Sequence, residues 1–482
     1  MFYYLQNYFL FILVIFLIYY SVSYRIRPYV LLVSGLCFIA AISVMFAIFA
    51  LAFTLMNFLF GKLLYHYLND PVKRPRIFWM IIITDIGLLS FFKYSVLFTS
   101  VFNILSAWSQ LQLKIPYSNI IVPLGMSYYT FQVLGYIIRI NRRSEIAEND
   151  FGLFASYLLF FPKFLSGPVE RSNHFFPQLK KNVPFDRENI YAGSRLFLWG
   201  LFKKAVIADS LYGPLFRVYD DIHSYSGLPL IIVLLFQTIY IYNDFSGYTD
   251  MALGSAKIFG IDLVDNFNRP FLARSISEYW RRWHISLSSW CNDFIYNPFI
   301  VKYRRFGGAA AIPGIFITFF IVGIWHGANW TFVVLGVLQA FAILYENYTK
   351  RVRIKITSGI PVKLVNTLSR IIVFLFMSFS MIFFFSNSIA DAWYFVTHLF
   401  TNVHFNKSEL AFISYKPEFI FSLGFFTLFF IFEMGIEKGN DIRLFFFQQS
   451  PWLKWMVYLV GILLIYHFNH TLGTSPFYYS RF

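Results

Sequence analysis

Long apolar segments separated by short polar connectors run along almost the whole chain. They are Phe2–Tyr20, Tyr29–Phe46, Ile48–Phe60, Phe78–Phe92, Ile120–Ile138, Phe151–Leu165, Leu196–Leu211, Leu228–Tyr242, Ile312–Trp325, Trp330–Leu344, Ile371–Phe385, Phe419–Met434 and Trp455–Phe468. A helix needs about 20 residues to cross the hydrocarbon core, so the shorter segments predict tilted, broken or re-entrant helices. The pattern predicts an all-α, polytopic membrane bundle of roughly ten to thirteen spanning helices, together with re-entrant or interfacial amphipathic helices.

The composition agrees with a membrane protein and excludes an ordinary soluble enzyme. Of 482 residues, 58% are apolar and 13% are charged, and the mean hydropathy is +0.59. A soluble domain carries about a quarter charged residues. We expect one multi-spanning domain over residues 1–482, with N-terminal helices in 1–120, a motif-bearing core in 121–345 and C-terminal helices in 346–482.

The formal net charge of +16 has an explanation in the membrane itself. Cytoplasmic loops of membrane proteins collect Lys and Arg, and anionic headgroups attract them. The chain has no RNP-type motif or zinc-finger spacing, so we expect membrane lipids and not nucleic acid as partners. It also has no HExxH motif, Walker loop or dinucleotide fingerprint, so we expect neither a metal nor a bound cofactor.

The longest interruption of the apolar pattern is Gly260–Gly308. Aromatic and apolar residues recur there at three- and four-residue spacing: Trp280, Trp283, Leu287, Trp290 and Phe294. This spacing predicts one amphipathic helix. Such a helix lies either in the headgroup plane or inside the bundle along a cavity, and the sequence leaves both open.

A histidine lies in the middle of the long apolar stretch from Ala309 to Leu344. As one helix, these residues would extend about 54 Å, which exceeds the hydrocarbon core. We therefore expect a break near Gly327 that opens His326 to a cavity. Asn329 shares a helical face with His326 if the helix continues. The alternative is a histidine that only bonds to a neighbouring helix.

Two further groups of polar residues are costly at membrane depth. Arg281, Arg282 and His284 lie between tryptophans and suit an anionic ligand such as a phosphate or a lipid headgroup, although interfacial anchoring needs the same residue types. Asp244 and Asp250 follow an apolar run, and we expect Gly247 to break the helix between them. Their expected role is structural, in ion pairs with Lys or Arg of the same core. From the residues alone, an enzyme and a transporter both remain open.

Six segments, in this order, resemble the membrane-bound O-acyltransferase family in its bacterial alginate O-acetyltransferase-like branch. They are PLGMSYYTFQ (123–132), FFPKFLSGPVERSNHFFPQL (160–179), GLFKKAVIAD (200–209), YNDFSGYTDMALG (242–254), NFNRPFLARSISEYWRRWHISLSSW (266–290) and GIWHGANWTFVVLG (323–336). The resemblance implies a helical bundle around a central tunnel. It also implies a multi-pass location in the bacterial cytoplasmic (inner) membrane.

The implied activity is O-acetylation of an extracytoplasmic polysaccharide, alginate-like or another cell-surface glycan. Acetyl-CoA on the cytoplasmic side is the implied donor substrate, and a periplasmic or surface-exposed esterase-like acetyltransferase is the implied partner. His326 matches the catalytic histidine of the family, and His284 matches the second histidine of this branch. An imidazole suits the removal of a proton from a hydroxyl that attacks a thioester.

Other residues receive supporting roles from the same resemblance. Asn329 and the Trp325 indole are candidate donors to the developing oxyanion. Candidate contacts to the phosphates of the donor are Arg281, Arg282, Lys203 and Lys204. Tyr479 matches a tyrosine in the terminal aromatic motif and is a candidate acyl relay, with an interfacial anchor as the alternative.

The chain departs from the pattern of this branch at three places. Ser480 and Arg481 replace the penultimate residues of the terminal motif, and Arg139 stands where relatives have aspartate. Residues 299–303 replace an expected glycine-rich loop, which concerns recognition of the acceptor or partner more than the acyl chemistry. Two alternatives remain: D-alanyl transfer from a carrier protein to teichoic acid, and a transporter or channel without covalent chemistry.

Overall fold

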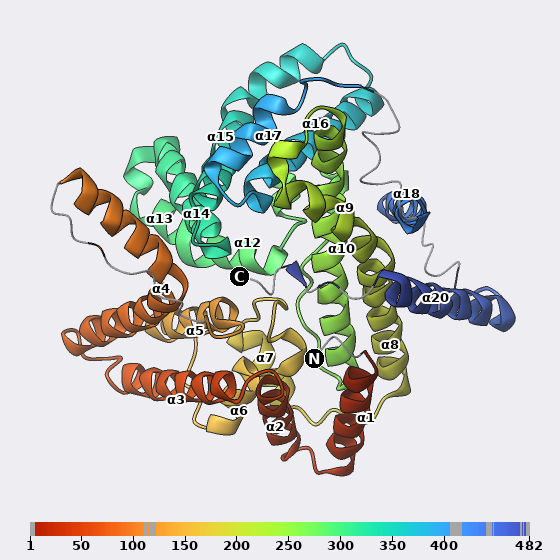
Figure 1. The fold of residues 1–482 in the computed structure, drawn as a ribbon. Helices are drawn as coiled ribbons and strands as arrows, with labels where there is room; N and C mark the ends of the chain where they lie inside the picture. Colours follow the sequence, from red (N-terminus) through yellow and green to blue (C-terminus); the bar gives the residue numbers. More distant parts are fainter. Residues whose placement is uncertain are drawn as a thin grey trace.

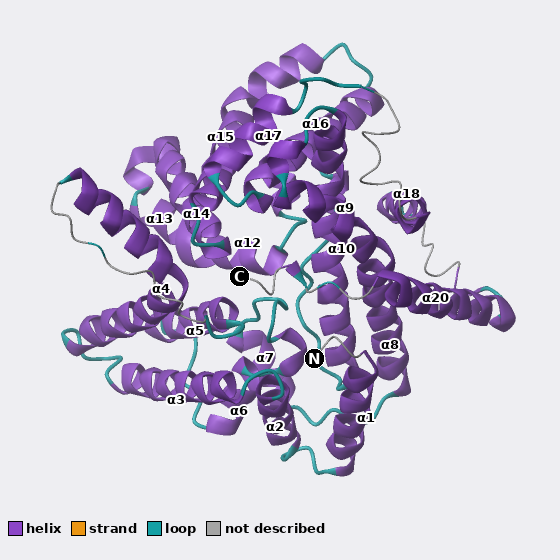
Figure 2. Ribbon diagram, in the orientation of Figure 1, coloured by secondary structure: helices purple, strands orange, loops and turns teal. Residues whose placement is uncertain are grey.

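The computed structural model describes residues 5–109, 114, 122–404, 417–439, 446, 448–472, 475, 477 and 478. Throughout these residues the regular elements are helices (Figure 2), and a lone bridge joins Phe267 to Trp283. The predicted all-α class is therefore confirmed.

Eight helical segments of the described part are long and apolar enough to cross a membrane. They are α3 (Val44–His66), Lys73–Ser95 within α4 (Lys73–Trp108), α10 (Leu228–Ile258), Arg304–His326 formed by η6 (Arg304–Ala310) and α14 (Ala311–His326), α15 (Trp330–Thr357), α16 (Val362–Phe385), Glu418–Glu437 within α18 (Pro417–Glu437) and Pro451–His470 within α20 (Pro451–Leu472). The chain is thus a multi-pass membrane protein.

The remaining elements are shorter and fill the space between these spans. The α-helices are α1 (Leu5–Ser21), α2 (Arg27–Ala40), α5 (Met126–Asn141), α6 (Phe151–Leu158), α7 (Ser172–Lys180), α8 (Arg187–Phe202), α9 (Asp209–Asp220), α11 (Ile276–Trp280), α12 (Ile285–Cys291), α13 (Asn297–Lys302) and α17 (Ile389–His398). The 3-10 turns are η1 (Phe161–Lys163), η3 (Ile222–Ser224) and η4 (Pro270–Leu272), and the π-helical turns are η2 (Lys203–Ala208) and η5 (Asn292–Tyr296).

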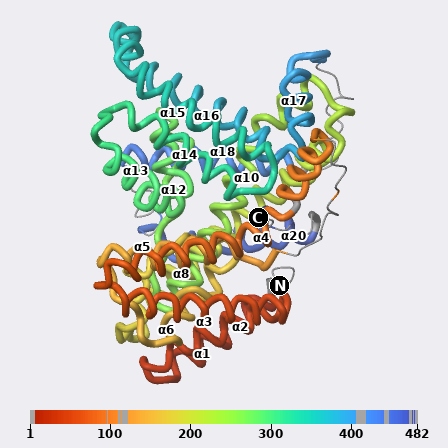
Figure 3. The backbone as a smooth tube through the Cα atoms, turned by 90° about the vertical axis from the view of Figure 1, so that its left-hand side faces the viewer, coloured from red at the N-terminus to blue at the C-terminus, as the bar shows by residue number. Residues whose placement is uncertain are grey.

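The first helices of the chain and the helices α15–α17 lie at opposite ends of the molecule. Helices α1, α2, α3 and α6 gather at the bottom of Figures 1 and 3, and α15, α16 and α17 lie at the top. Helix α10 lies between them and packs against α8, α9 and α16. This central helix thereby joins the two groups.

Helix α10 runs unbroken through Gly247, so the predicted break there is wrong. Gly247 and Gly254 face Gly200 and Gly193 of α8. A Cβ atom added at Gly247 would lie 2.8 Å from the Gly200 carbonyl oxygen, and one at Gly254 would lie 2.5 Å from that of Gly193. These glycines therefore serve the close approach of two helices, which is common inside membranes, and do not end the helix.

Candidate active site

The predicted break near Gly327 is confirmed. Helix α14 ends at His326, Gly327 is extended with φ −176° and ψ 162°, and α15 begins at Trp330. The side chain of Asn329 caps α15: its Oδ1 accepts a hydrogen bond from the Thr331 N–H at 3.2 Å, and its Nδ2 donates to the Asn387 carbonyl at 2.6 Å. The oxygen and the nitrogen of this amide thus both stabilise the turn that follows His326.

His326 is buried, and its ring is held in one tautomer. Its Nδ1 lies 2.7 Å from the carbonyl oxygen of Val322, one turn earlier in α14. Because a carbonyl can only accept a hydrogen bond, the proton of the neutral ring is on Nδ1. Nε2 is then the basic nitrogen, and its orientation is set by the helix itself.

The indole of Trp325 lies beside both histidines. Its ring centre is 5.0 Å from that of His326 and 5.7 Å from that of His284. The residue is 3% exposed, and its Nε1 has no hydrogen-bond partner among the residues the structure describes. Buried donors are nearly always bonded, so this N–H is a strong candidate for binding a reacting group.

The amphipathic pattern of 280–294 does not form one helix, and that prediction is wrong. Helix α11 ends at Trp280 and α12 begins at Ile285, because His284 adopts a left-handed conformation with φ 45°. On both sides of this turn the backbone is hydrogen-bonded to the extended segment 266–268. The Asn268 N–H donates to the Arg282 carbonyl at 2.9 Å, and the Ile285 N–H donates to the Asn266 carbonyl at 3.0 Å. Left-handed backbone at a residue other than glycine is strained and clusters at functional sites.

Asn266 orients the imidazole of His284. Its Oδ1 accepts the N–H of Ser286 at 3.2 Å and the hydroxyl of Ser286 at 2.6 Å, so this atom is the oxygen of the amide. The same Oδ1 lies 3.2 Å from Nδ1 of His284, which must therefore carry the proton. Burial, together with the nearby His326, holds the pKa of His284 well below its usual value. The ring is therefore neutral at neutral pH, with Nε2 as its acceptor nitrogen.

A small cavity of about 20 Å³ lies beside His326. Its walls include Trp280 and Trp283 from the α11–α12 region, Gly323 and Gly336 where α14 meets α15, and Met377, Met381 and Phe384 of α16. A space of this size holds roughly one water molecule or a group of similar size. The expected opening of His326 to a cavity is thus confirmed, whereas the central tunnel stays a prediction.

Three of the four candidate phosphate contacts bind carboxylates. Lys203 pairs with Asp250 at 2.5 Å, and the buried Lys204 lies 2.7 Å from Asp244 and 2.8 Å from Asp209. These contacts bring Asp244 and Asp250 into the ion pairs that the sequence predicts for them.

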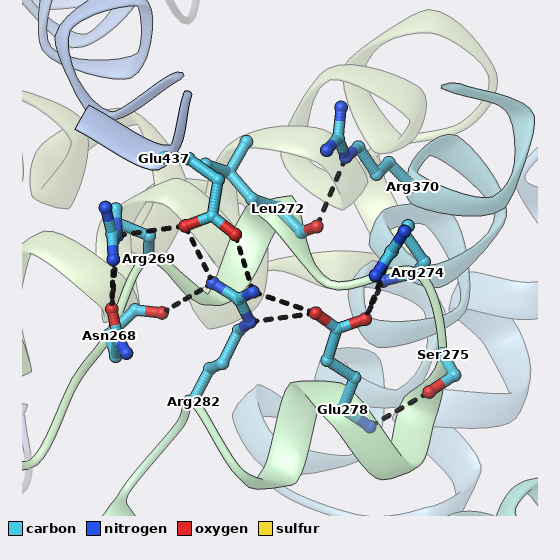
Figure 4. Close-up of polar contacts among 9 residues, drawn as sticks. All are labelled: Asn268, Arg269, Leu272, Arg274, Ser275, Glu278, Arg282, Arg370 and Glu437. Atoms are coloured by element: carbon cyan, nitrogen blue, oxygen red, sulfur yellow. Dashed lines mark hydrogen bonds and ion pairs between the residues drawn. The ribbon is translucent and has the colours of Figure 1, made fainter. Parts of the chain in front are cut away.

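Arg282 is also held by acidic groups. Its guanidinium lies between Glu278, at 2.8 Å, and Glu437 at the end of α18, at 2.7 Å (Figure 4). Arg281, in contrast, is exposed and forms no ion pair with another described residue. Of the four cations, Arg281 is therefore the one whose charge is available for a ligand.

Lys93 of α4 reaches the site, although the sequence analysis does not single it out. Its Nζ donates hydrogen bonds to the carbonyl of Trp325 and to the hydroxyl of Ser127, the second at 3.0 Å. In the sequence, Lys93 directly follows the apolar segment Phe78–Phe92, so it has the position expected of a polar connector between two helices. Helix α4 continues past it to Trp108, and this continuation could be recognised only from the apolar residues that follow.

The C-terminal segment also approaches the site. Tyr479, the candidate acyl relay, lies outside the described residues. Its neighbour Tyr478 donates its N–H to Oδ2 of Asp244 at 2.9 Å. The ring of Tyr478 is 5.6 Å from that of Phe384, which in turn is 5.6 Å from the ring of His326.

Comparison with known proteins agrees with this architecture. The family model of the membrane-bound O-acyltransferase family matches residues 3–386. The peptidoglycan O-acetyltransferase of Helicobacter pylori is 30% identical over 373 residues, which are 69% of this chain and 68% of that protein. The probable alginate O-acetylase of Pseudomonas aeruginosa is 29% identical over 407 residues, or 83% and 75% of the two chains.

The teichoic acid D-alanyltransferase of Bacillus subtilis is similar over a smaller part. It is 28% identical over 245 residues, which are 49% of this chain and 62% of that protein. The resemblance seen in the sequence motifs is thus confirmed over most of the chain. It also replaces the transporter alternative with an enzyme. Because the family model spans well over half of its residues, this protein belongs to the membrane-bound O-acyltransferase family and is an O-acyltransferase.

Proposed function

We propose that this protein takes an acetyl group from acetyl-CoA on the cytoplasmic side of the bacterial inner membrane and transfers it towards a hydroxyl of an extracytoplasmic polysaccharide. The observation that carries this proposal is the setting of His326. Its Nδ1–H is bound to Val322, and a cavity of about 20 Å³ adjoins it. The ring of Trp325 is centred 5.0 Å away, and its Nε1–H has no hydrogen-bond partner among the described residues. The O-acetylating relatives support the choice of acyl group.

In the proposed reaction, Nε2 of His326 removes the proton of the attacking hydroxyl. The hydroxyl oxygen forms a bond with the thioester carbonyl carbon, and the carbonyl electrons move to its oxygen. When this tetrahedral intermediate collapses, the carbon–sulfur bond breaks and the thiolate takes the proton from the imidazolium. A positioned general base of this kind contributes about 10²–10⁴ in rate.

Trp325 supplies the donor for the oxyanion in this scheme. Trp325 is only 3% exposed, so its Nε1–H lies away from water, where a hydrogen bond to a developing charge is strong. Asn329 is less suited, because its amide holds the turn after His326. His284, with Nδ1–H directed to Asn266, offers its Nε2 as an acceptor that orients the incoming hydroxyl.

The distribution of basic residues supports the cytoplasmic entry of the donor. Arg74 at the start of α4 bonds to Asn141 at the end of α5, and Arg142 bonds to the Asp293 carbonyl in η5. Helix α14, which follows Arg304 and Arg305, packs against the same η5. These basic helix ends therefore share one side, and the positive-inside rule assigns that side to the cytoplasm. The exposed Arg281 is our candidate for a contact to the donor phosphates.

In this proposal, a partner protein transfers the acyl group to the polysaccharide that finally accepts it. A periplasmic or surface-exposed esterase-like acetyltransferase would collect the acyl group, with Tyr479 as the candidate relay. The bond between Asp244 and the Tyr478 N–H supports this role, because it holds Tyr478, the residue before the candidate relay in the sequence, close to Phe384, whose ring contacts that of His326.

The donor is tested with purified protein in phospholipid vesicles. With an alginate-like or other cell-surface glycan supplied as the acceptor, we expect radiolabelled acetyl-CoA to be consumed, with release of the free thiol, whereas a D-alanyl-charged carrier protein should give no transfer. Consumption of the charged carrier alone would support the D-alanyl alternative. Neither donor being consumed, in protein that also fails to restore glycan acetylation in cells, would refute the proposal.

The cavity beside His326 predicts a short acyl chain. Met381 is 7% exposed and lines this cavity, so Met381→Ala should enlarge it. We expect the ratio of kcat/KM for butyryl-CoA to that for acetyl-CoA to rise about tenfold or more, since each methylene in an apolar pocket changes discrimination by about 10–200-fold. Met456→Ala, at an exposed position of α20, is the matched control and should leave this ratio unchanged. An unchanged ratio in Met381→Ala would show that the cavity does not receive the acyl chain.

A further inference from the structure

Lys93 is a buried amine that the proposed reaction does not use. It lies within the membrane-spanning part of α4, Lys73–Ser95, and the residue is only 9% exposed. Ionisable residues at membrane depth are costly and usually functional. The position of this lysine therefore calls for a specific role.

Its contacts are to the end of the helix that carries His326. The Nζ atom donates to the carbonyl oxygen of Trp325, and it lies 5.7 Å from the centre of the Trp325 ring. The next residue, Tyr94, donates its hydroxyl to the carbonyl oxygen of Ile324 at 2.6 Å. Two successive residues of α4 thus bind two successive carbonyls of α14.

These carbonyls need partners because of where α14 ends. The last four carbonyls of an α-helix have no partner within the helix, and α14 ends at His326. No water is present in the bilayer core to satisfy them. Lys93 and Tyr94 therefore act as a cap supplied by another helix.

We propose that Lys93 is a positioning residue for acyl transfer. By binding the Trp325 carbonyl and lying over the Trp325 ring, it fixes both the indole N–H and, one residue further, the imidazole of His326. The two groups that the reaction needs belong to the last two residues of α14, so movement of this helix end would displace both. This inference rests on the proposed function, since it assumes that His326 and Trp325 contact the reacting atoms.

The test compares Lys93→Met with Lys93→Arg, using acetyl-CoA as the probe, the same glycan acceptor as above, and release of the thiol in vesicles as the readout. We expect Lys93→Met to lower kcat about a hundredfold, because a displacement near 1 Å of a reacting group has an effect of this size. KM for acetyl-CoA should change less than about threefold, since ground-state binding is retained. Lys93→Arg keeps N–H donors at this position, and it should recover kcat to within about tenfold of the wild type.

Two further variants keep the test decisive. Tyr94→Phe removes the hydrogen bond to the Ile324 carbonyl without altering a charge, and it should lower kcat several-fold. This variant carries the test if Lys93→Met does not fold. Lys73→Met, at the exposed start of the same helix, should match the wild type. A wild-type kcat in folded Lys93→Met, a loss confined to KM, or Lys93→Arg no better than Lys93→Met would overturn the inference.

The outcome can be separated from that of the proposed function. If the wild type consumes no acetyl-CoA, the proposed function fails whatever Lys93→Met does. If His326→Ala retains turnover, the role of His326 fails together with the inference that rests on it. If His326→Ala is inactive and folded Lys93→Met turns over like the wild type, only the role of Lys93 is refuted.

Discussion

Replacement of His326 by alanine is expected to lower acyl transfer by a factor of about 10²–10⁴, because the general base is lost. The protein should still fold and insert, since the side chain makes its hydrogen bond within its own helix, to Val322. The measurement is thiol release from acetyl-CoA by purified protein, combined with the amount of protein that elutes as a monodisperse peak in detergent.

A second histidine variant controls for general effects of the substitution. His66 is exposed at the end of α3, far along the chain from the site, and His66→Ala should retain full activity. Gln in place of His326 keeps a polar side chain but no base, so it should be as inactive as alanine. Full transfer by either His326 variant would remove this residue from the mechanism.

Lys204→Met is expected to destabilise the protein by about 3–5 kcal/mol, because it leaves two buried carboxylates without their cation. Lys204 is 5% exposed, and its Nζ lies between Asp209 and Asp244. It also donates to the Ser475 hydroxyl at 2.9 Å and lies 4.7 Å from the centre of the Phe477 ring. The effect should appear as a large fall in the midpoint of thermal unfolding in detergent.

The stability lost in Lys204→Met should be restored by changes to the two carboxylates that Lys204 binds. Replacing Asp209 and Asp244 with asparagine in the Lys204→Met background removes the uncompensated charges, and it should recover most of the lost stability. Lys257→Met is the matched control, because its pair with Asp262 is exposed and should contribute at most about 1 kcal/mol. If Lys204→Met and Lys257→Met unfold at the same temperature, the buried cluster does not stabilise the fold.

Much of this architecture is predictable because the bilayer imposes strong local rules. The break at Gly327 follows from length alone, since no single helix of that apolar stretch fits the hydrocarbon core. The cost of a buried charge predicts the ion pairs of Asp244 and Asp250 without naming their partners. These rules depend only on the chain and the membrane.

The errors arise where a distant segment decides the local conformation. The stripe from Trp280 to Phe294 has helical spacing, but bonds to 266–268 turn the backbone at His284. Gly247 has the low helix propensity that suggested a break, yet the close approach of α8 overrides it. The cap from Lys93 to Trp325 joins residues that are 232 positions apart, so no local pattern contains it.

The contact between Arg282 and Glu437 joins the motif-bearing core to a helix that lies beyond the family match. The match to the family stops at residue 386, but Glu437 is the terminal residue of α18 and also lies 3.3 Å from Arg269 (Figure 4). An enzyme shortened at residue 386 would leave the guanidinium groups of Arg269 and Arg282 without this counter-ion. Arg282 lies two residues before His284. Truncation at residue 386 is therefore expected to disturb the turn that carries His284.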